Sequence, residues 1–264
     1  MSNLLVNEHN FAIWNLPLNM TDIGLLSVIV IIAGAVRGFA GFGLSAVTVT
    51  LGSIWFDLRI TVPLCFLIEI IASVHMLKSV YRQIDRLLLS GLIIGCAIGM
   101  PLGQTLLLVL PIDTTRALLY SLVICSVVTI QLGYGFSFNP NARAGAVIGI
   151  AAGISSGLAS IGGLITMVAL LGTNYDVSRA RATLVAMFFV LYTYGTAIGL
   201  INGVMTVATF QIAAVMFIPL VFGVVIGQKG YLITSPEKFR QIMLWLLAVI
   251  AVIGAFRVIF HKLF

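Results

Sequence analysis

Charged residues are the scarcest class in this 264-residue sequence, which has 8% Asp, Glu, Lys and Arg against 61% hydrophobic residues. An average soluble domain carries about a quarter charged residues, so this chain has too few polar groups to cover a water-soluble globule. Apolar runs of about 20 residues, the length that crosses a hydrocarbon core of roughly 30 Å, recur between residues 21 and 260. We therefore predict an all-α integral membrane protein that spans the cytoplasmic membrane many times.

Other absences exclude whole classes of function. The three cysteines, Cys65, Cys96 and Cys125, each lie inside an apolar run, so a disulfide framework is not expected. The spans contain no paired acids and no His-x-x-x-His spacing, so we predict no enzyme, no metal and no cofactor. The 14 Lys and Arg are scattered singly, without a basic run, and nucleic acid is not an expected partner.

Two apolar segments are too long for a single crossing. Residues 21–56 and 142–173 each run for more than 30 residues, and glycine-rich stretches interrupt them at Gly38–Gly43 (GFAGFG) and Gly157–Gly163 (GLASIGG). Such interruptions favour broken helices. The ordinary spans are predicted at about 60–78, 87–110, 117–136, 182–201, 204–227 and 241–259.

The two interruptions belong to an internal duplication. A shift of 119 residues places AGAVRGFAGFG on AGISSGLASIG, with Gly38 over Gly157 and Gly43 over Gly162. A shift of 124 continues the match through glycine, glutamine and arginine positions. We predict two repeats, residues 21–136 and 143–264, each a glycine-broken hairpin plus three transmembrane helices. Residues 137–142 link them, and residues 1–20 form an interfacial lead-in.

Loop charge decides how the repeats are related. If each long segment crosses once, the cations divide six against seven between the two faces, which is no bias. If each returns to its starting face, nine lie on one face and four on the other, as the positive-inside rule requires. We therefore predict inverted repeats with both termini outside. The nine are Lys78, Arg82, Arg86, Arg143, Arg179, Arg181, Lys229, Lys238 and Arg240.

Glycine also recurs every four residues within one predicted span. This spacing is typical of close helix packing, and we assign it no chemistry. The same packing role is the alternative for the glycines of the two interruptions. The series is Gly91, Gly95, Gly99 and Gly103.

Broken helices in matching positions of inverted halves favour a substrate site at the middle of the membrane. Their half-helix N-termini carry unpaired N–H groups and positive partial charge, which suit an anion. Arg37 lies beside the first break, where an ionised side chain needs a partner. Its counterpart is Ser156, preceded by Ser155. The alternatives are that Arg37 reaches an interface, or pairs with Glu69 for structure only.

Two titratable residues of the third segment are candidates for ion coupling. Glu69 lies in the middle of an apolar span and could carry a coupling proton, and His75 follows six residues later. A structural role is the alternative for both. The duplication places Ser73 and His75 over Tyr192 and Tyr194, which with Thr193 form a candidate polar lining.

With VRGFAGFG in the first half and GLASIGG in the second, the sequence resembles the TauE/SafE family over about residues 21–260. Residues 37–43 and 157–163 match the family motifs directly. The resemblance implies a secondary transporter of a small sulfur-containing anion, such as sulfite, sulfoacetate, isethionate or another sulfonate. Alternating access coupled to a proton or sodium gradient is the implied mechanism.

The predicted site combines both motifs with the lining. A passive anion channel, a membrane-embedded enzyme and a non-transporting partner subunit are the competing hypotheses. The direction of transport, the coupling ion and a homodimeric state stay open. The predicted substrate-binding residues are Arg37, Gly38, Phe39, Ala40, Gly41, Phe42, Gly43, Ser155, Ser156, Gly157, Ser160, Gly162, Gly163, Tyr192 and Tyr194, with Glu69 and His75 as coupling residues.

Overall fold

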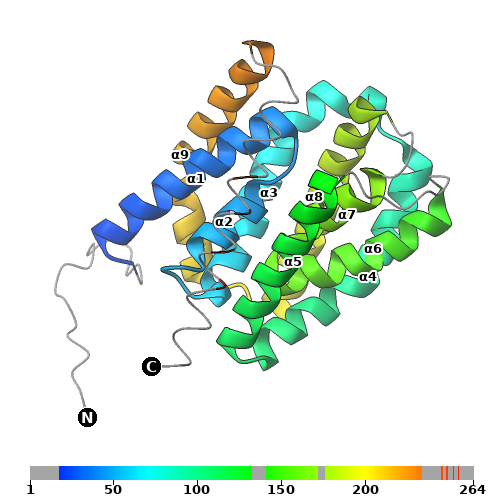
Figure 1. The fold of residues 1–264 in the computed structure, drawn as a ribbon. Helices are drawn as coiled ribbons and strands as arrows, with labels where there is room; N and C mark the ends of the chain where they lie inside the picture. The colour runs from blue at the N-terminus through cyan, green and yellow to red at the C-terminus, as the bar shows by residue number, and fades with distance from the viewer. Residues whose placement is uncertain are drawn as a thin grey trace.

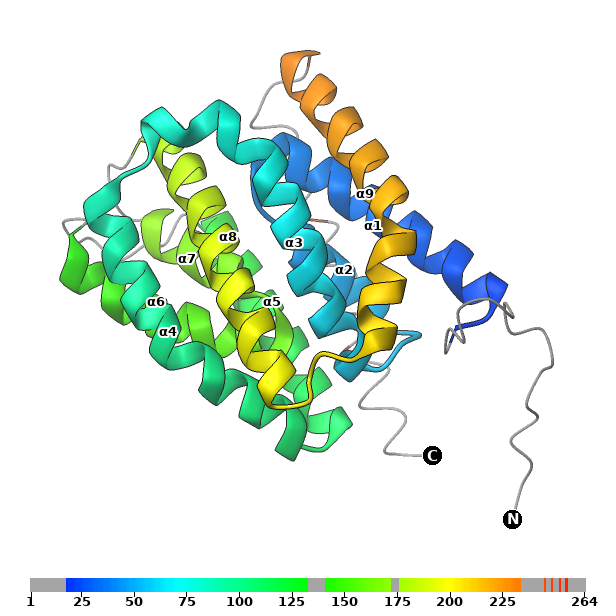
Figure 2. The same cartoon turned by 180° about the vertical axis from the view of Figure 1, so that it is seen from behind.

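A computed structural model describes residues 18–132, 141–171 and 176–233, with Trp245, Ala248, Val252 and Ala255. All regular secondary structure of the described residues is helical (Figures 1 and 2). The predicted lead-in, apart from its last three residues, most of the linker and most of the 241–259 span lie outside the described residues. The elements are α1 (Met20–Ala40), α2 (Leu44–Gly52), α3 (Leu58–Val80), the short 3-10 helix η1 (Tyr81–Gln83), α4 (Arg86–Val109), α5 (Ile112–Leu132), α6 (Ala142–Ala159), α7 (Gly162–Leu171), α8 (Val177–Ile201) and α9 (Val207–Ile233).

Seven of the described helices are long and apolar enough to cross a membrane, which makes this a multi-pass membrane protein. They are α1, α3, α4, α5, α6, α8 and α9. On α4, the side chains of Ile94, Ile98 and Leu102 form an outward stripe and are more than half exposed. Such a surface fits lipid and not water. The prediction of an all-helical membrane protein is confirmed.

The two remaining α-helices, α2 and α7, are the short halves of broken segments. They have 9 and 10 residues, so each is only about 14–15 Å long and cannot span the bilayer. α1 ends before Gly41, which has φ 81°, and α2 begins after Gly43, which has φ 93°. α6 ends before Ser160, which has φ 57°, and α7 begins at Gly162. Both predicted interruptions are therefore confirmed.

Left-handed residues end both long halves in the same way. The Gly41 amide donates to the Arg37 carbonyl at 2.8 Å, and the Ser160 amide donates to the Ser156 carbonyl at 2.8 Å. Glycine tolerates this conformation easily, whereas serine adopts it at a cost. After the first turn the chain reverses, so that α2 packs against both α1 and α3 (Figure 1).

Glycines hold two pairs of long helices in close contact, α4 against α6 and α1 against α9 (Figure 2). A methyl group on Gly99 of α4 would overlap the Ile150 carbonyl of α6. A methyl group on Gly223 of α9 would overlap the Ile31 carbonyl of α1. The same holds throughout the predicted packing series, whose role is confirmed. Its members are Gly91, Gly95, Gly99 and Gly103.

Helices α3 and α8 pack against each other and run antiparallel. Phe66 of α3 lies against Tyr192 of α8, with ring centroids 5.3 Å apart. Beyond the C-terminal end of α3, the amide of Asp85, which directly precedes α4, donates to Thr183 near the start of α8, at 3.1 Å. The two turns of the broken segments lie beside the contact between α3 and α8, so side chains from both turns can meet there.

Candidate functional site

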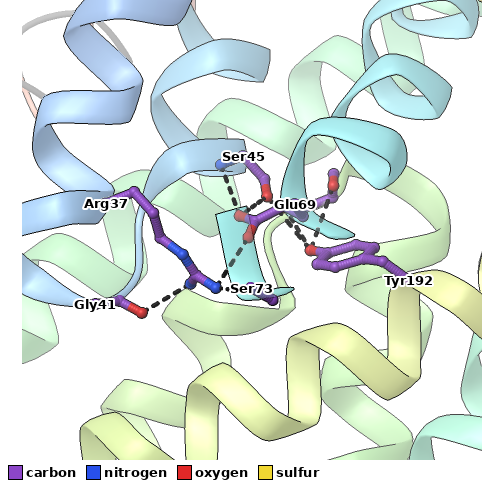
Figure 3. Close-up of polar contacts among 7 residues, drawn as sticks. Arg37, Gly41, Ser45, Glu69, Ser73 and Tyr192 are labelled. Atoms are coloured by element: carbon purple, nitrogen blue, oxygen red, sulfur yellow. Dashed lines mark hydrogen bonds and ion pairs between the residues drawn. The ribbon is translucent and has the colours of Figure 1, made fainter. Parts of the chain in front are cut away.

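Arg37, in the last turn of α1, is the centre of a buried polar cluster (Figure 3). Its side chain is 0% exposed. Nη1 donates to the Gly41 carbonyl at 2.7 Å, and Nη2 donates to Ser73 Oγ at 2.8 Å. Nη2 also forms an ion pair with Glu69 Oε2 at 3.3 Å. An arginine at this depth requires an anionic partner, and here that partner is Glu69.

The Glu69 carboxylate lies at the N-terminus of α2. Its Oε1 accepts from the Ser45 amide at 3.1 Å and from the Ser45 hydroxyl. The first amides of a helix have no partner within the helix and carry positive partial charge, which makes a helix N-terminus an anion-binding position. The carboxylate of Glu69 therefore lies in a position that would suit a small oxyanion, at the N-terminus of α2.

Tyr192 of α8 connects this cluster to the second break. Its hydroxyl lies 3.5 Å from Ser45 Oγ and donates to the Ser160 carbonyl at 3.3 Å. Ser160 Oγ in turn donates to the Tyr192 oxygen at 3.3 Å. Phe188, one turn before Tyr192, places its ring 4.6 Å from the Arg37 Cζ atom. The two broken segments thus share one polar network (Figure 3).

Several polar atoms at the two breaks have no hydrogen-bond partner in the part of the chain that the structure describes. They include Arg37 Nε and Ser156 Oγ, and Glu69 Oε2 has only its ion pair. Arg37 and Ser156 are both 0% exposed. Buried polar groups are normally satisfied because leaving one unpaired costs about 1–3 kcal/mol. Polar atoms without a hydrogen-bond partner therefore occur at both breaks.

The structure brings some of the sequence-predicted residues together and separates others. Arg37, Gly41, Glu69, Ser160 and Tyr192 share the network described above, and Ser73 joins it. Ser156 lies beside the start of α7, where a methyl group on Gly162 would overlap its hydroxyl. The remaining motif residues shape the turns or pack against neighbouring helices, and they are Gly38, Phe39, Ala40, Phe42, Gly43, Gly157 and Gly163.

Three predicted residues point away from the network. His75 is exposed and borders a small apolar cavity of about 20 Å³ between α3 and α9. The Tyr194 hydroxyl donates to Ala97 of α4 at 3.0 Å. Ser155 Oγ donates at 2.8 Å to the backbone of its own helix. Residues two positions apart on a helix point in nearly opposite directions, so Tyr192 and Tyr194 cannot line the same site.

The structure adds three residues that the sequence did not indicate. Ser45 follows the first glycine motif directly and holds Glu69. Phe188 lies over the Arg37 guanidinium, and the shift of 119 pairs it with Glu69. Arg181 of α8 donates to the Gly38 carbonyl at 3.2 Å, and a methyl group on Gly41 would overlap its side chain. The hydrogen bond between Arg181 and Gly38 joins residues 143 positions apart, and no local pattern encodes it.

The cluster combines one guanidinium, one carboxylate and several hydroxyls, all of them buried. Among the residues that the structure describes, no three His, Cys, Asp or Glu side chains gather as metal ligands. Comparison with known families gives one match, in which the family model described as sulfite exporter TauE/SafE covers residues 26–253. No curated protein and no solved structure matches the chain. The chain therefore belongs to the TauE/SafE sulfite exporter family, whose members are membrane transporters and not enzymes.

Proposed function

We propose that this protein is a secondary transporter that carries a small sulfur-containing anion through the site at Arg37. The cargo is a sulfonate, such as isethionate or sulfoacetate, or sulfite. One observation carries the proposal: a fully buried arginine lies between two broken-helix turns, with its Nε hydrogen-bonded to nothing in the described residues. Family membership supplies the class of cargo.

A purely structural Arg37–Glu69 pair explains less. A buried ion pair is often no more stabilising than well-packed apolar residues of the same size, because both charges lose their hydration. Such a pair also gives no reason for the unsatisfied hydroxyl of Ser156 beside α7. An anion that alternates with Glu69 as the partner of Arg37 would account for the buried ion pair and for the Ser156 hydroxyl.

The donors around the two breaks match the oxygens of a sulfonate or sulfite group. The guanidinium of Arg37 and the amide at Ser45 would bind the anion from the first half. The hydroxyls of Ser156, Ser160 and Tyr192 would bind it from the second. Charge-assisted hydrogen bonds of this kind are roughly twice as strong as neutral ones. The anion would therefore bind tightly only when donors from both halves contact it.

Glu69 is the coupling residue in this proposal, and His75 is not. Glu69 contacts Arg37 directly, so any change in its charge alters the anion site. His75 is exposed on another face of the same helix and borders the small apolar cavity between α3 and α9. The proposed coupling ion is a proton, with sodium as the alternative that the experiment below separates.

We further propose inverted repeats that rock against each other. The turn residues Gly41 and Ser160 correspond under the shift of 119 and share the left-handed conformation. The shift also pairs α3 with α8, which pack antiparallel. A two-fold axis that exchanges antiparallel membrane helices lies in the membrane plane, which is the geometry of an inverted repeat. Rocking about this axis would expose the site to each side in turn.

Loop charge supports an orientation with both termini outside. Contacts join the α2–α3 and α4–α5 connections at one end of the helices, where Arg59 reaches Leu108 and Arg116 reaches Phe56. These two arginines are the described cations of that end. The other end carries seven, so it is the proposed cytoplasmic side. The seven are Lys78, Arg82, Arg86, Arg143, Arg179, Arg181 and Lys229.

Uptake into proteoliposomes tests the proposal. We expect saturable flux of isethionate or sulfite, with accumulation above equilibrium when a proton gradient is imposed. Arg37→Gln should abolish this flux. The matched control Arg59→Gln removes an exposed cation and should leave it intact. Full flux in Arg37→Gln would remove Arg37 from the site, and flux that never exceeds equilibrium under a proton or sodium gradient would identify a channel.

A further inference from the structure

The Glu69 carboxylate uses the donors that a bound oxyanion would need. Arg37 Nη2 contacts Oε2 at 3.3 Å, while the amide and hydroxyl of Ser45 both reach Oε1. These contacts combine a guanidinium, a hydroxyl and a helix N-terminus, the groups that bind phosphate, sulfate and carboxylate in proteins. While Glu69 is ionised and in place, an external anion meets a site that is already filled.

We infer that Glu69 is a built-in competitor of the cargo, and that one proton on Glu69 and one monovalent anion together replace its carboxylate. This inference rests on the proposed function and specifies its coupling and the charge of its cargo. A proton from the aqueous side binds the carboxylate and makes it a neutral acid. Arg37 and the Ser45 amide then bind the anion, and both cargo species leave on the other side.

The exchange of the Glu69 carboxylate for a proton and an anion leaves the net charge of the cluster unchanged, because Arg37 is the only charged group in direct contact with Glu69 among the contacts described above. Arg37 faces it from α1, and the Tyr192 hydroxyl faces it from α8. Cys65 lies one turn earlier on α3, while α2 contributes the hydroxyl and backbone of Ser45. Arg181 of α8 lies farther off, against Gly41, and is partly exposed; its charge is present before and after the exchange.

Two states of the cluster therefore carry the same charge. Ionised Glu69 with Arg37 sums to zero, and so does protonated Glu69 with Arg37 and a monoanion. An anion that entered without a proton would leave one negative charge uncompensated within the membrane, which is costly. A divalent anion would do so even with the proton. The geometry thus favours a singly charged sulfonate carried together with one proton.

The membrane potential separates this exchange from other couplings. One elementary charge moved across 100 mV changes an accumulation ratio by about 50-fold. In proteoliposomes clamped with potassium and valinomycin, we expect isethionate accumulation to follow the proton gradient and to change less than twofold between 0 and −100 mV. Its apparent affinity should fall by up to about tenfold for each tenfold drop in proton concentration, because one proton binds with each anion. Sulfoacetate has a carboxylate where isethionate has its hydroxymethyl group, and this second negative charge should make it compete at least tenfold more weakly at pH 8.

Variants assign the effect to Glu69. Glu69→Gln keeps an oxygen for Ser45 but cannot ionise, so isethionate binding should become independent of pH and uptake should respond to the potential. His75→Gln removes the histidine of α3, which lies outside the cluster, and should keep the wild-type pH response. A Glu69→Gln protein that still accumulates isethionate along the proton gradient would overturn the inference.

The wild-type protein alone also decides the matter if Glu69→Gln does not fold. Arg37-dependent uptake that follows the potential as one moving charge, or that follows sodium and not protons, would overturn this inference and leave the proposed function standing. Absence of any Arg37-dependent uptake would instead overturn the proposed function.

Discussion

Separating the structural from the functional role of the Arg37–Glu69 pair gives the sharpest prediction. Removing one partner of a buried ion pair leaves an uncompensated charge and costs about 3–5 kcal/mol. Arg37→Met does this, because the Glu69 carboxylate then keeps only the two donors of Ser45. The double variant Arg37→Met/Glu69→Gln removes the charge and retains an oxygen for Ser45.

The double variant should regain most of the lost stability. The Gly41 carbonyl and Ser73 still lack the donor that contacted them at 2.7 and 2.8 Å, which leaves a residual cost of about 2 kcal/mol. The double variant should therefore be about 1–3 kcal/mol more stable than Arg37→Met. Together with the wild type and the single variant Glu69→Gln, the two proteins complete a double-mutant cycle. Unfolding in mixed dodecyl maltoside and SDS micelles measures the free energy of unfolding of all four proteins.

Transport of the same four proteins completes the test. We expect no saturable isethionate uptake by the double variant, although it folds, because the guanidinium that binds the anion is gone. Stability losses that simply add would refute the assigned ion pair. Uptake at the wild-type rate would show that the pair serves the fold and not the cargo.

Three further predictions concern the packing, the turn and the orientation. Gly95→Ala places a methyl group against the Ala146 carbonyl of α6. The free energy of unfolding should therefore drop by about 1–3 kcal/mol. The control Ile94→Ala, on the exposed face of α4, should change it by less than about 1 kcal/mol. Gly41→Ala strains a residue at φ 81° that also touches an arginine side chain, and should cost about 1–2 kcal/mol and slow uptake. Arg82→Cys, in a cysteine-free chain, should react with an impermeant maleimide only from the cytoplasmic side; labelling from outside would reverse the proposed orientation.

Most of the fold could be predicted because membrane spans and their interruptions are local properties of the sequence. Apolar length identifies the spans, and glycine identifies the breaks, since few other residues reach the φ of 81° and 93° that Gly41 and Gly43 adopt. Ser160 has the same handedness without glycine, and only its alignment with Gly41 could have indicated that. Local patterns therefore located both turns.

The site was only partly predictable because the sequence does not give helix rotation. Arg37 and Glu69 stand out as ionisable groups inside apolar runs, and the structure pairs them. Alignment of the repeats also suggested His75 and Tyr194, but it gives correspondence between halves and not the direction of a side chain. The contact of Phe188 with Arg37 joins α8 to the end of α1, and no local pattern encodes it.

The two halves differ at the positions that carry charge in the proposed site. Under the shift of 119, Arg37 corresponds to Ser156 and Glu69 corresponds to Phe188. The second half therefore retains the turn and a hydroxyl but neither charge, and Phe188 places an aromatic ring over the guanidinium that Glu69 neutralises. A second buried ion pair would add its own desolvation cost. Because Arg37 and Glu69 both lie in the first half, the rocking motion that we propose would not pull this ion pair apart, and the second half would contribute only neutral donors to the anion.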